Sequence, residues 1–213
     1  MNNPITQPNE TLINHFKGTV DLHRVASSIQ KLFNAASQHT GRDCYTIADL
    51  GRKLLQREGI LSARLVVGFA AWRVGDGDAD VISHILMPGQ RIQPASFPYH
   101  AWVEVTGEEL PGKKVLIDFS TYSLPTKARM LDQLDGGKTD VTWSPAFIVA
   151  TEDQVSSYEE TASLNAGKFF YVRIPQLEDF MKKDYTPCEA DFTMLQMIFE
   201  NPDAQVCGLN HTS

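Results

Sequence analysis

The order of the secondary-structure signals constrains the fold of this 213-residue chain more than any other feature. Between residues 21 and 57, apolar side chains recur every three or four positions, which is the period of a helix with one buried face. Between residues 63 and 119 the pattern changes to short runs rich in β-branched and aromatic residues, separated by turns. Helices followed by a series of antiparallel strands predict an α+β fold with the helices on one side of a sheet.

The boundaries of these elements follow from glycine, proline and capping residues. The second helix is expected to begin at Cys44, and the preceding Asp43 is expected to cap its first turn with its side chain. The expected helices cover residues 21–39, 44–57, 127–134 and 190–200, and the expected strands cover residues 63–72, 81–87, 99–105, 114–119, 145–150 and 169–174.

Composition is that of a water-soluble globular protein, with 42% hydrophobic and 21% charged residues. No run of residues approaches the ~18 consecutive apolar positions that a membrane-spanning helix requires. The first ten residues lack the basic start and apolar run of an export signal, so a cytoplasmic location is expected. We expect one domain over residues 1–213, with its core at about 20–120 and accessory strands and helices over 121–213.

Charge and cysteine usage narrow the classes of function. The net charge of −7 repels phosphate backbones and anionic lipid, so neither nucleic acid nor a membrane is an expected partner. The three cysteines, Cys44, Cys188 and Cys207, are odd in number and widely spaced. This pattern fits neither a disulfide framework nor a pair of metal-binding cysteines, and reduced thiols are expected.

Cys44 has the setting that a thiol nucleophile requires. The thiolate is the form that attacks, and the unpaired amides of a helix N-terminus lower the pKa of a thiol placed there. The backbone amide of Cys44 is one of those donors, so it can stabilise an oxyanion. The adjacent Asp43 carboxylate acts in the opposite direction unless its side chain turns away into the cap. A cysteine at a helix start is more often structural, so the catalytic interpretation requires a base.

His100 and Asp118 are candidates for that base and for the group that orients it. They lie on two successive strands joined by a turn near residues 107–112. In a hairpin of this length they are expected to oppose each other on one face, with Cβ atoms ~5 Å apart. The carboxylate can then accept a hydrogen bond from one imidazole nitrogen while the other nitrogen faces the sulfur.

The segments that carry these three residues resemble the transglutaminase-like superfamily. The stretches CYTIADL from Cys44, HAWVEV from His100 and VLID ending at Asp118 are similar to the family's three motifs, in its order of Cys, His and Asp. The resemblance covers about residues 41–120 and includes the strand-like segment over residues 62–69.

This resemblance implies a papain-like cysteine-proteinase fold, with Cys44 as nucleophile, His100 as base and Asp118 as its orienting carboxylate. Gln38 stands six residues before Cys44, as does the oxyanion-binding glutamine of papain-like enzymes. The flanking Gly-Ser and aromatic residue of papain are absent around Cys44. The Arg-Gly-Gly lead of arylamine N-acetyltransferases is also absent, which argues against acetyl-CoA as donor. No metal or organic cofactor is implied.

The expected function is a cysteine-dependent hydrolase or acyltransferase that acts on a peptide or small amide through an acyl-enzyme. One alternative is a non-catalytic binding module on the same scaffold. Another is a metal site of His84, His100 and Asp118, because zinc and iron often bind two histidines and a carboxylate. Trp102 shares the face of His100, and His84 lies on a strand expected to neighbour that of His100, so both are candidate pocket residues.

Overall fold

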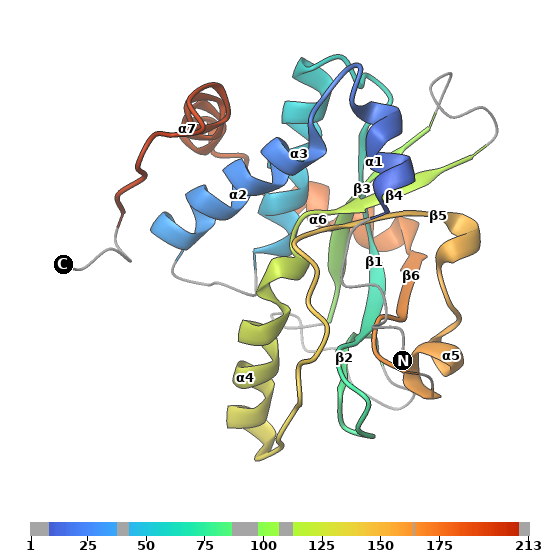
Figure 1. Cartoon of the computed structure of the whole chain (residues 1–213). Coiled ribbons are helices and arrows are strands. Elements are labelled where there is room, and N and C mark those ends of the chain that lie inside the picture. The colour runs from blue at the N-terminus through green and yellow to red at the C-terminus, as the bar shows by residue number, and fades with distance from the viewer. Residues whose placement is uncertain (1–8, 38–42, 87–97, 107–112, 164, 209–213) are drawn as a thin grey trace.

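The computed structural model describes residues 9–37, 43–86, 98–106, 113–163 and 165–208 (Figure 1). The helices of this part of the chain are α1 (Glu10–Phe16), α2 (Leu22–Ala36), α3 (Cys44–Arg57), α4 (Leu124–Asp135), α5 (Tyr158–Ser163), α6 (Pro175–Asp184) and α7 (Glu189–Glu200). The strands are β1 (Arg64–Arg73), β2 (Val81–His84), β3 (His100–Val105), β4 (Val115–Asp118), β5 (Ile148–Thr151) and β6 (Phe169–Arg173).

The strands form one antiparallel sheet organised around β1, which is ten residues long. Gly68 pairs with both His100 of β3 and Arg173 of β6, so β3 and β6 lie on opposite edges of β1. β2 pairs with the second half of β1 and therefore follows β3 along the same edge. β4 pairs with β3, and β5 with β4. The expected α+β class and the antiparallel pairing of β1 with β2 are thus confirmed.

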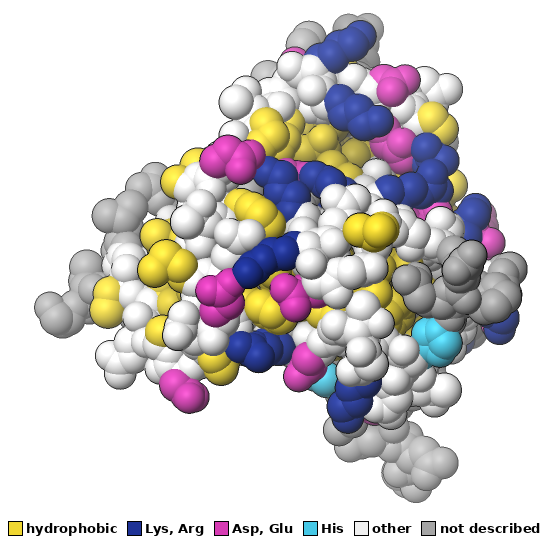
Figure 2. Space-filling view, turned by 90° about the horizontal axis from the view of Figure 1, so that it is seen from above, with side chains coloured by type: hydrophobic (Ala, Val, Ile, Leu, Met, Phe, Trp, Pro, Cys, Tyr) yellow, Lys and Arg dark blue, Asp and Glu magenta, His cyan; other side chains and the backbone are white. Residues whose placement is uncertain are grey.

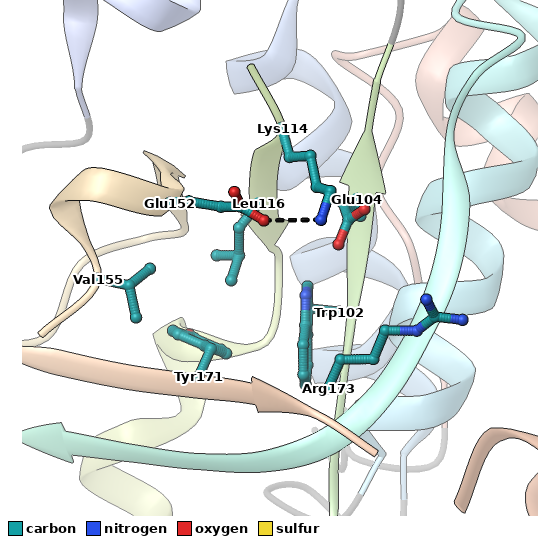
Figure 3. Close-up of a pocket in the computed structure, with 8 residues that line it drawn as sticks. All are labelled: Trp102, Glu104, Lys114, Leu116, Glu152, Val155, Tyr171 and Arg173. Atoms are coloured by element: carbon teal, nitrogen blue, oxygen red, sulfur yellow. Dashed lines mark hydrogen bonds and ion pairs between the residues drawn. The ribbon is translucent and has the colours of Figure 1, made fainter. Parts of the chain in front are cut away.

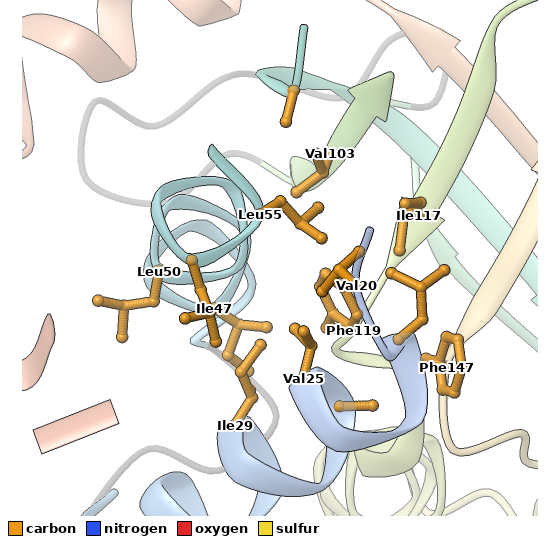
Figure 4. Packing of buried hydrophobic residues seen from close by; sticks show 14 of the residues in the cluster. Val20, Val25, Ile29, Ile47, Leu50, Leu55, Val103, Ile117, Phe119 and Phe147 are labelled. Atoms are coloured by element: carbon orange, nitrogen blue, oxygen red, sulfur yellow. The ribbon is translucent and has the colours of Figure 1, made fainter. Parts of the chain in front are cut away.

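One face of the sheet packs against the N-terminal helices. Alternate residues of the strands, such as Val103 and Ile117, meet apolar side chains of α2 and α3 in a large buried cluster (Figure 4). α1 and α7 extend the same cluster through Ile13 and Leu195. The helical period expected in the N-terminal half therefore does bury one stripe of α2 and of α3 against the sheet.

The other face is covered as well, which corrects the expectation that helices lie on one side only. Every residue of β3 and of β4 is buried. Trp102 and Leu116 belong to a second buried cluster, to which α4 contributes Leu124 and Ala128. In Figure 1, α4 lies apart from α2 and α3, beside β2. Trp102 and Leu116 on this face are apolar, so they too need a cover of protein atoms.

Gly68 allows the backbone of β6 to approach that of β1 closely. A Cβ atom at position 68 would lie 1.9 Å from the carbonyl oxygen of Val172, a distance that no side chain can adopt. With glycine there, β6 places Tyr171 among the aromatic side chains of the second cluster. The candidate site depends on this close approach, because the hydroxyl of Tyr171 forms a hydrogen bond there.

Helices α1, α5 and α6 were not expected from the sequence. α1 and α5 are short, and α6 carries five charged residues besides its apolar positions, so the helical period is weak in each. None of the helices in the described part of the chain has the length and apolarity needed to span a bilayer. On the face shown in Figure 2, basic and acidic side chains are interspersed.

Candidate functional site

The fold brings Cys44, His100 and Asp118 together. Cys44 is the first residue of α3, His100 the first of β3 and Asp118 the last of β4. Because β3 and β4 are antiparallel, the start of one and the end of the other lie at the same end of the sheet. His100 Nε2 lies 2.8 Å from Asp118 Oδ2, and His100 is close enough to Cys44 to lower the pKa of its thiol. The exposed fractions of Cys44, His100 and Asp118 are 4%, 0% and 1%, so the group is buried.

The strand register differs from the expected one by two residues. Glu104 lies opposite Leu116 and Val103 opposite Ile117, so His100 and Asp118 are diagonal neighbours and not direct partners. The expectation of direct opposition is therefore wrong, although both side chains point to the same face. A strand has a side-chain period of two, so a shift of two residues preserves the face. The long imidazole side chain spans the remaining diagonal distance.

Asp118 is held by four hydrogen bonds. Its Oδ1 accepts from the backbone N–H of Ser120 at 2.9 Å and from the Ser120 hydroxyl at 2.7 Å. Its Oδ2 accepts from His100 and, at 2.7 Å, from the hydroxyl of Tyr171. Burial acts to raise the pKa of Asp118, but the charge of His100 and these hydrogen bonds outweigh it and hold the pKa well below its usual range. Asp118 is therefore an ionised, immobile acceptor.

The hydrogen bond to Asp118 determines which nitrogen of His100 faces the sulfur. Because Nε2 donates to the carboxylate, Nδ1 is the nitrogen left to accept a proton from a thiol. Nδ1 is buried and has no hydrogen-bond partner among the described residues. Burial acts to lower the pKa of His100, but Asp118 and Cys44 outweigh it and raise that pKa. The imidazole is thus prepared to hold a second proton.

The Cys44 thiol has a lowered pKa. Burial alone would raise it, but the neighbouring imidazole of His100 and its positive charge lower it further than burial raises it. Smaller contributions come from the charge of Lys127 and from the backbone N–H of Ala101, which donates toward the sulfur. The combination of a lowered thiol pKa and a raised imidazole pKa favours a thiolate–imidazolium pair.

The cap of α3 differs from the expected one. Asp43 makes no side-chain capping hydrogen bond to the first turn, and its Oδ2 instead accepts from the Ser37 hydroxyl at 2.5 Å. The expectation that the carboxylate of Asp43 binds the first-turn amides is therefore wrong. As a result, that carboxylate does not occupy the helix N-terminus at which Cys44 begins. The role of the Cys44 amide in binding an oxyanion remains a prediction.

His84 lies near His100, but its strand does not pair with the strand of His100. β2 and β3 do not pair with each other; both pair with β1, one after the other along the same edge. The rings of His84 and His100 have centroids 5.7 Å apart. His84 Nδ1 lies 2.9 Å from the carbonyl oxygen of Tyr99, so it donates and carries the proton. Burial, with the charge of Lys127, holds the pKa of His84 well below its usual value, and the ring is neutral.

Two further predictions concern a metal site of His84, His100 and Asp118 and an oxyanion-binding role of Gln38. Within the described residues, no group of three or more His, Cys, Asp or Glu side chains is arranged to hold a metal ion. In particular, His100 Nε2 is hydrogen-bonded directly to Asp118 Oδ2, so these two atoms do not coordinate a common metal ion in this arrangement. Gln38 lies outside the described residues.

Several residues of the site were not found from the sequence. The hydroxyl of Tyr171 accepts from Trp72 Nε1 at 2.8 Å and donates to Asp118, so Trp72 and Tyr171 extend the hydrogen-bonded chain. Lys127 of α4 is 5% exposed, and its ammonium lies 5.0 Å from the centroid of the Trp72 ring. A signal for Lys127 exists, because it falls within the apolar stripe of its helix beside Leu124 and Ala128.

Trp102, the predicted pocket residue, does line a pocket, but the pocket lies beyond the site. Trp102 stacks on His100 with centroids 6.3 Å apart. On its other side is a pocket of about 260 Å³, shown in Figure 3. Trp102 and Tyr171 therefore stand between this pocket and the pair of His100 and Asp118. The pocket is lined by Trp102, Glu104, Lys114, Leu116, Glu152, Val155, Tyr171 and Arg173.

The charged side chains of this pocket are engaged with each other or with neighbours. Lys114 donates to Glu152 at 2.8 Å, as the dashed line in Figure 3 marks. Arg173 forms a two-point ion pair with Glu178, and Glu104 pairs with Arg64. Each of these charges is thus compensated by an ion pair within the protein.

Comparisons with known proteins bear on the fold. No family model matches the sequence, and no curated protein matches it either. The chain is similar to a crystal structure described as genomics APC5867, with a TM-score of 0.56 over 88% of this chain and 83% of that chain. The two sequences are 17% identical, so the similarity shows a shared fold and nothing about activity.

The hydroxyl of Tyr171 provides a test of the hydrogen-bonded chain. Replacing Tyr171 by phenylalanine leaves Trp72 Nε1 without its acceptor and Asp118 with three donors instead of four. We expect the free energy of unfolding to fall by about 1–3 kcal/mol, since a buried donor loses its partner. Urea unfolding at pH 7 measures this change, with Tyr158→Phe on α5 as the matched control. Equal stability of the two variants would show that the hydroxyl of Tyr171 has no structural role.

Proposed function

We propose that this protein is a cysteine-dependent hydrolase or acyltransferase of the transglutaminase-like superfamily, with a papain-like fold, acting on amide or peptide carbonyls. The observation that supports the proposal is the buried group of Asp118, His100 and Cys44 at the start of α3, in which Asp118 is hydrogen-bonded to His100 and His100 lowers the pKa of the thiol. A base between a thiol and a carboxylate is the arrangement that nucleophilic catalysis requires.

The first half of the reaction uses the two ring nitrogens of His100 differently. The Cys44 thiolate attacks the carbonyl carbon, a C–S bond forms, and the carbonyl oxygen becomes an oxyanion. His100 then donates the proton on Nδ1 to the leaving nitrogen as the C–N bond breaks. Throughout, Nε2 keeps its proton on the hydrogen bond to Asp118, which stabilises the imidazolium without taking the proton.

The second half releases the acyl group. Water or an amine attacks the thioester carbonyl while His100 Nδ1 takes a proton from the attacking group. The C–S bond breaks and the thiolate of Cys44 is regenerated. Hydrolysis and transfer share each of these steps, and the acceptor that enters the site decides between them. Because the side chains of Cys44 and His100 are buried, an acceptor reaches them through local opening of the surrounding structure.

Alkylation as a function of pH tests the proposal directly. The rate for an unactivated thiol rises about tenfold for each pH unit below its pKa, whereas an existing thiolate reacts at a nearly constant rate. We expect iodoacetamide to alkylate Cys44 with a nearly flat profile between pH 6 and 8. The measurement uses a Cys188→Ser, Cys207→Ser variant, so that Cys44 is the remaining thiol.

The slope of the profile is the useful readout, because burial of Cys44 slows alkylation by a factor that does not depend on pH. The control is Cys44→Ser, in which alkylation reports Cys188 and Cys207, both of them exposed. A tenfold rise per pH unit for Cys44 would remove the proposed nucleophile and favour a binding module. If the profile is flat, peptide and amide libraries that trap an acyl group on Cys44 identify the substrate class.

A further inference from the structure

Lys127 is a buried cation that the reaction described above does not use. Its side chain points from α4 into the second buried cluster, between the positions of Leu124 and Ala128. The ammonium lies 5.0 Å from the centroid of the Trp72 ring, and that ring makes an edge-to-face contact with His100 at 4.7 Å. A lysine is almost never this deeply buried unless it is paired with something.

The indole ring of Trp72 provides part of the compensation for the buried ammonium. A cation over a tryptophan ring is attracted by the ring quadrupole. This attraction is smaller than the cost of moving an ammonium out of water, even after the protein relaxes. The cation–π contact is therefore too weak by itself, and negative charge must contribute.

The negative groups that act on Lys127 belong to the candidate site. Burial lowers the pKa of Lys127, while the charges of Cys44, Asp118 and Asp43 act in the opposite direction. Two of these come from the start of α3 and one from the end of β4. Two histidines face the same space, His84 of β2 and His100 of β3. The phenols of Tyr99 and Tyr171, which interact with Cys44 and Asp118, are further titratable groups of this environment. Lys127 thus lies within the electrostatic field of the reacting groups.

A charge count shows what the ammonium contributes. Moving a proton from the Cys44 sulfur to His100 Nδ1 leaves the sum of charges on these two groups at zero. The Asp118 carboxylate therefore leaves the buried trio with one uncompensated negative charge, before and after this transfer. The Lys127 ammonium brings the buried group to neutrality. An uncompensated buried charge is costly, so the ammonium stabilises the carboxylate of Asp118 in both forms, and its charge interaction with Cys44 favours the thiolate in addition.

We propose that Lys127 is a positioning residue whose ammonium stabilises the thiolate of Cys44 and the oxyanion that forms from it. The inference rests on the proposed function, since it concerns the same thiol. It adds a fourth charged member to the site, supplied by a helix outside the region that resembles the transglutaminase-like superfamily. The oxyanion replaces the thiolate as the negative group in the same volume, so the ammonium acts on both states.

The test is the alkylation profile of Cys44 after Lys127→Met, in the Cys188→Ser, Cys207→Ser background. Methionine has a similar length and is apolar, so it fits a buried position without a charge. We expect the pH at which the alkylation rate is half-maximal to rise by about one unit, which is a roughly tenfold loss of thiolate at lower pH. Lys127→Arg restores a cation and is expected to recover part of the shift.

Two controls separate this role from a structural one. Lys182→Met removes an exposed lysine from α6 and should leave the profile unchanged. Thermal unfolding of Lys127→Met verifies that the variant is folded, and Lys127→Gln, a neutral polar residue of similar length, replaces it if it is not. A structural role would change the unfolding temperature without a shift in the alkylation profile and without recovery by arginine.

The outcomes also separate this inference from the proposed function. If Lys127→Met is folded and the profile stays at its wild-type position while His100→Ala shifts it, the inference about Lys127 is wrong and the proposed function stands. If neither substitution shifts the profile, the proposed function is contradicted together with the inference. A shift in both variants supports both.

Discussion

Replacing His100 by alanine is expected to slow the alkylation of Cys44 at pH 6 by about tenfold to a hundredfold. The neighbouring imidazole of His100 and its charge are what overcome the effect of burial on the thiol. Without them, burial remains and raises the pKa of Cys44, so the fraction of thiolate at pH 6 falls. The measurement is the rate of iodoacetamide alkylation in the Cys188→Ser, Cys207→Ser background.

The control for this prediction is His23→Ala, which removes a half-exposed histidine of α2 that pairs with Glu10. Its alkylation profile should match that of the parent. If His100→Ala is folded and alkylates Cys44 at the parent rate, the imidazole is not the base of this thiol. A rise in rate would indicate that the substitution opens the site, which the unfolding transition of the variant would reveal.

Replacing Asp118 by alanine is expected to have the largest effect on stability, a loss of about 3–5 kcal/mol in the free energy of unfolding. The carboxylate accepts four hydrogen bonds, and their donors, on His100, Tyr171 and Ser120, are themselves buried. Removal of the acceptor leaves these donors unsatisfied and the imidazole of His100 without its counter-charge. Urea unfolding at pH 7 measures the loss, with Asp184→Ala on the exposed surface of α6 as control.

The pH dependence of this difference has a definite sign. The pKa of Asp118 is held below its ordinary value of 3.8, so the folded state binds a proton less readily than the unfolded chain does. The stabilisation is therefore fully present above about pH 4 and is lost as the pH falls through the lowered pKa. Asp118 also raises the pKa of His100, which burial alone would lower, so His100 adds to the gap between the native protein and Asp118→Ala most strongly near pH 5. The gap should therefore narrow toward pH 7, and it should narrow again below about pH 4 as Asp118 takes up a proton. A gap that does not narrow below pH 4 would contradict a charge on Asp118.

The parts of the fold that depend on local periodicity were predicted well. The apolar stripe of α2 and the start of α3 at Cys44 agree with the structure, because a helix of this length expresses its period within a single segment. The strands were predicted to within a few residues for the same reason. The short helices α1 and α5 were missed because too few apolar positions recur in each to define a period.

The site shows how much of its geometry can be predicted from the spacing of residues along the chain. The placement of His100 and Asp118 on one face followed from the side-chain period of two and was correct even though the register was not. The position of His84 was close to right for a different reason, since β2 and β3 follow each other along β1 and do not pair. Which face of the sheet a side chain occupies is thus predicted more reliably than which residue lies opposite it on the next strand.

Tyr171 and Lys127 could not be assigned to the site from local pattern. Tyr171 reaches Asp118 only because β6 pairs with β1 across about a hundred residues of chain, and because Gly68 leaves room for that strand. Lys127 reaches the site because α4 covers the second face of the sheet. Long-range pairings of this kind depend on which surfaces bury each other, and the energy of burial belongs to the assembled core.

By itself, the amino-acid sequence determined the class of fold, the helix that begins at Cys44 and the common face of His100 and Asp118, because each of these depends on a period that repeats within a short segment. Tertiary structure alone decided that the thiol, the imidazole and the carboxylate are buried together, and that Tyr171 and Lys127 join them. Burial and long-range pairing set the charges of these groups, and both arise only when distant segments pack against each other.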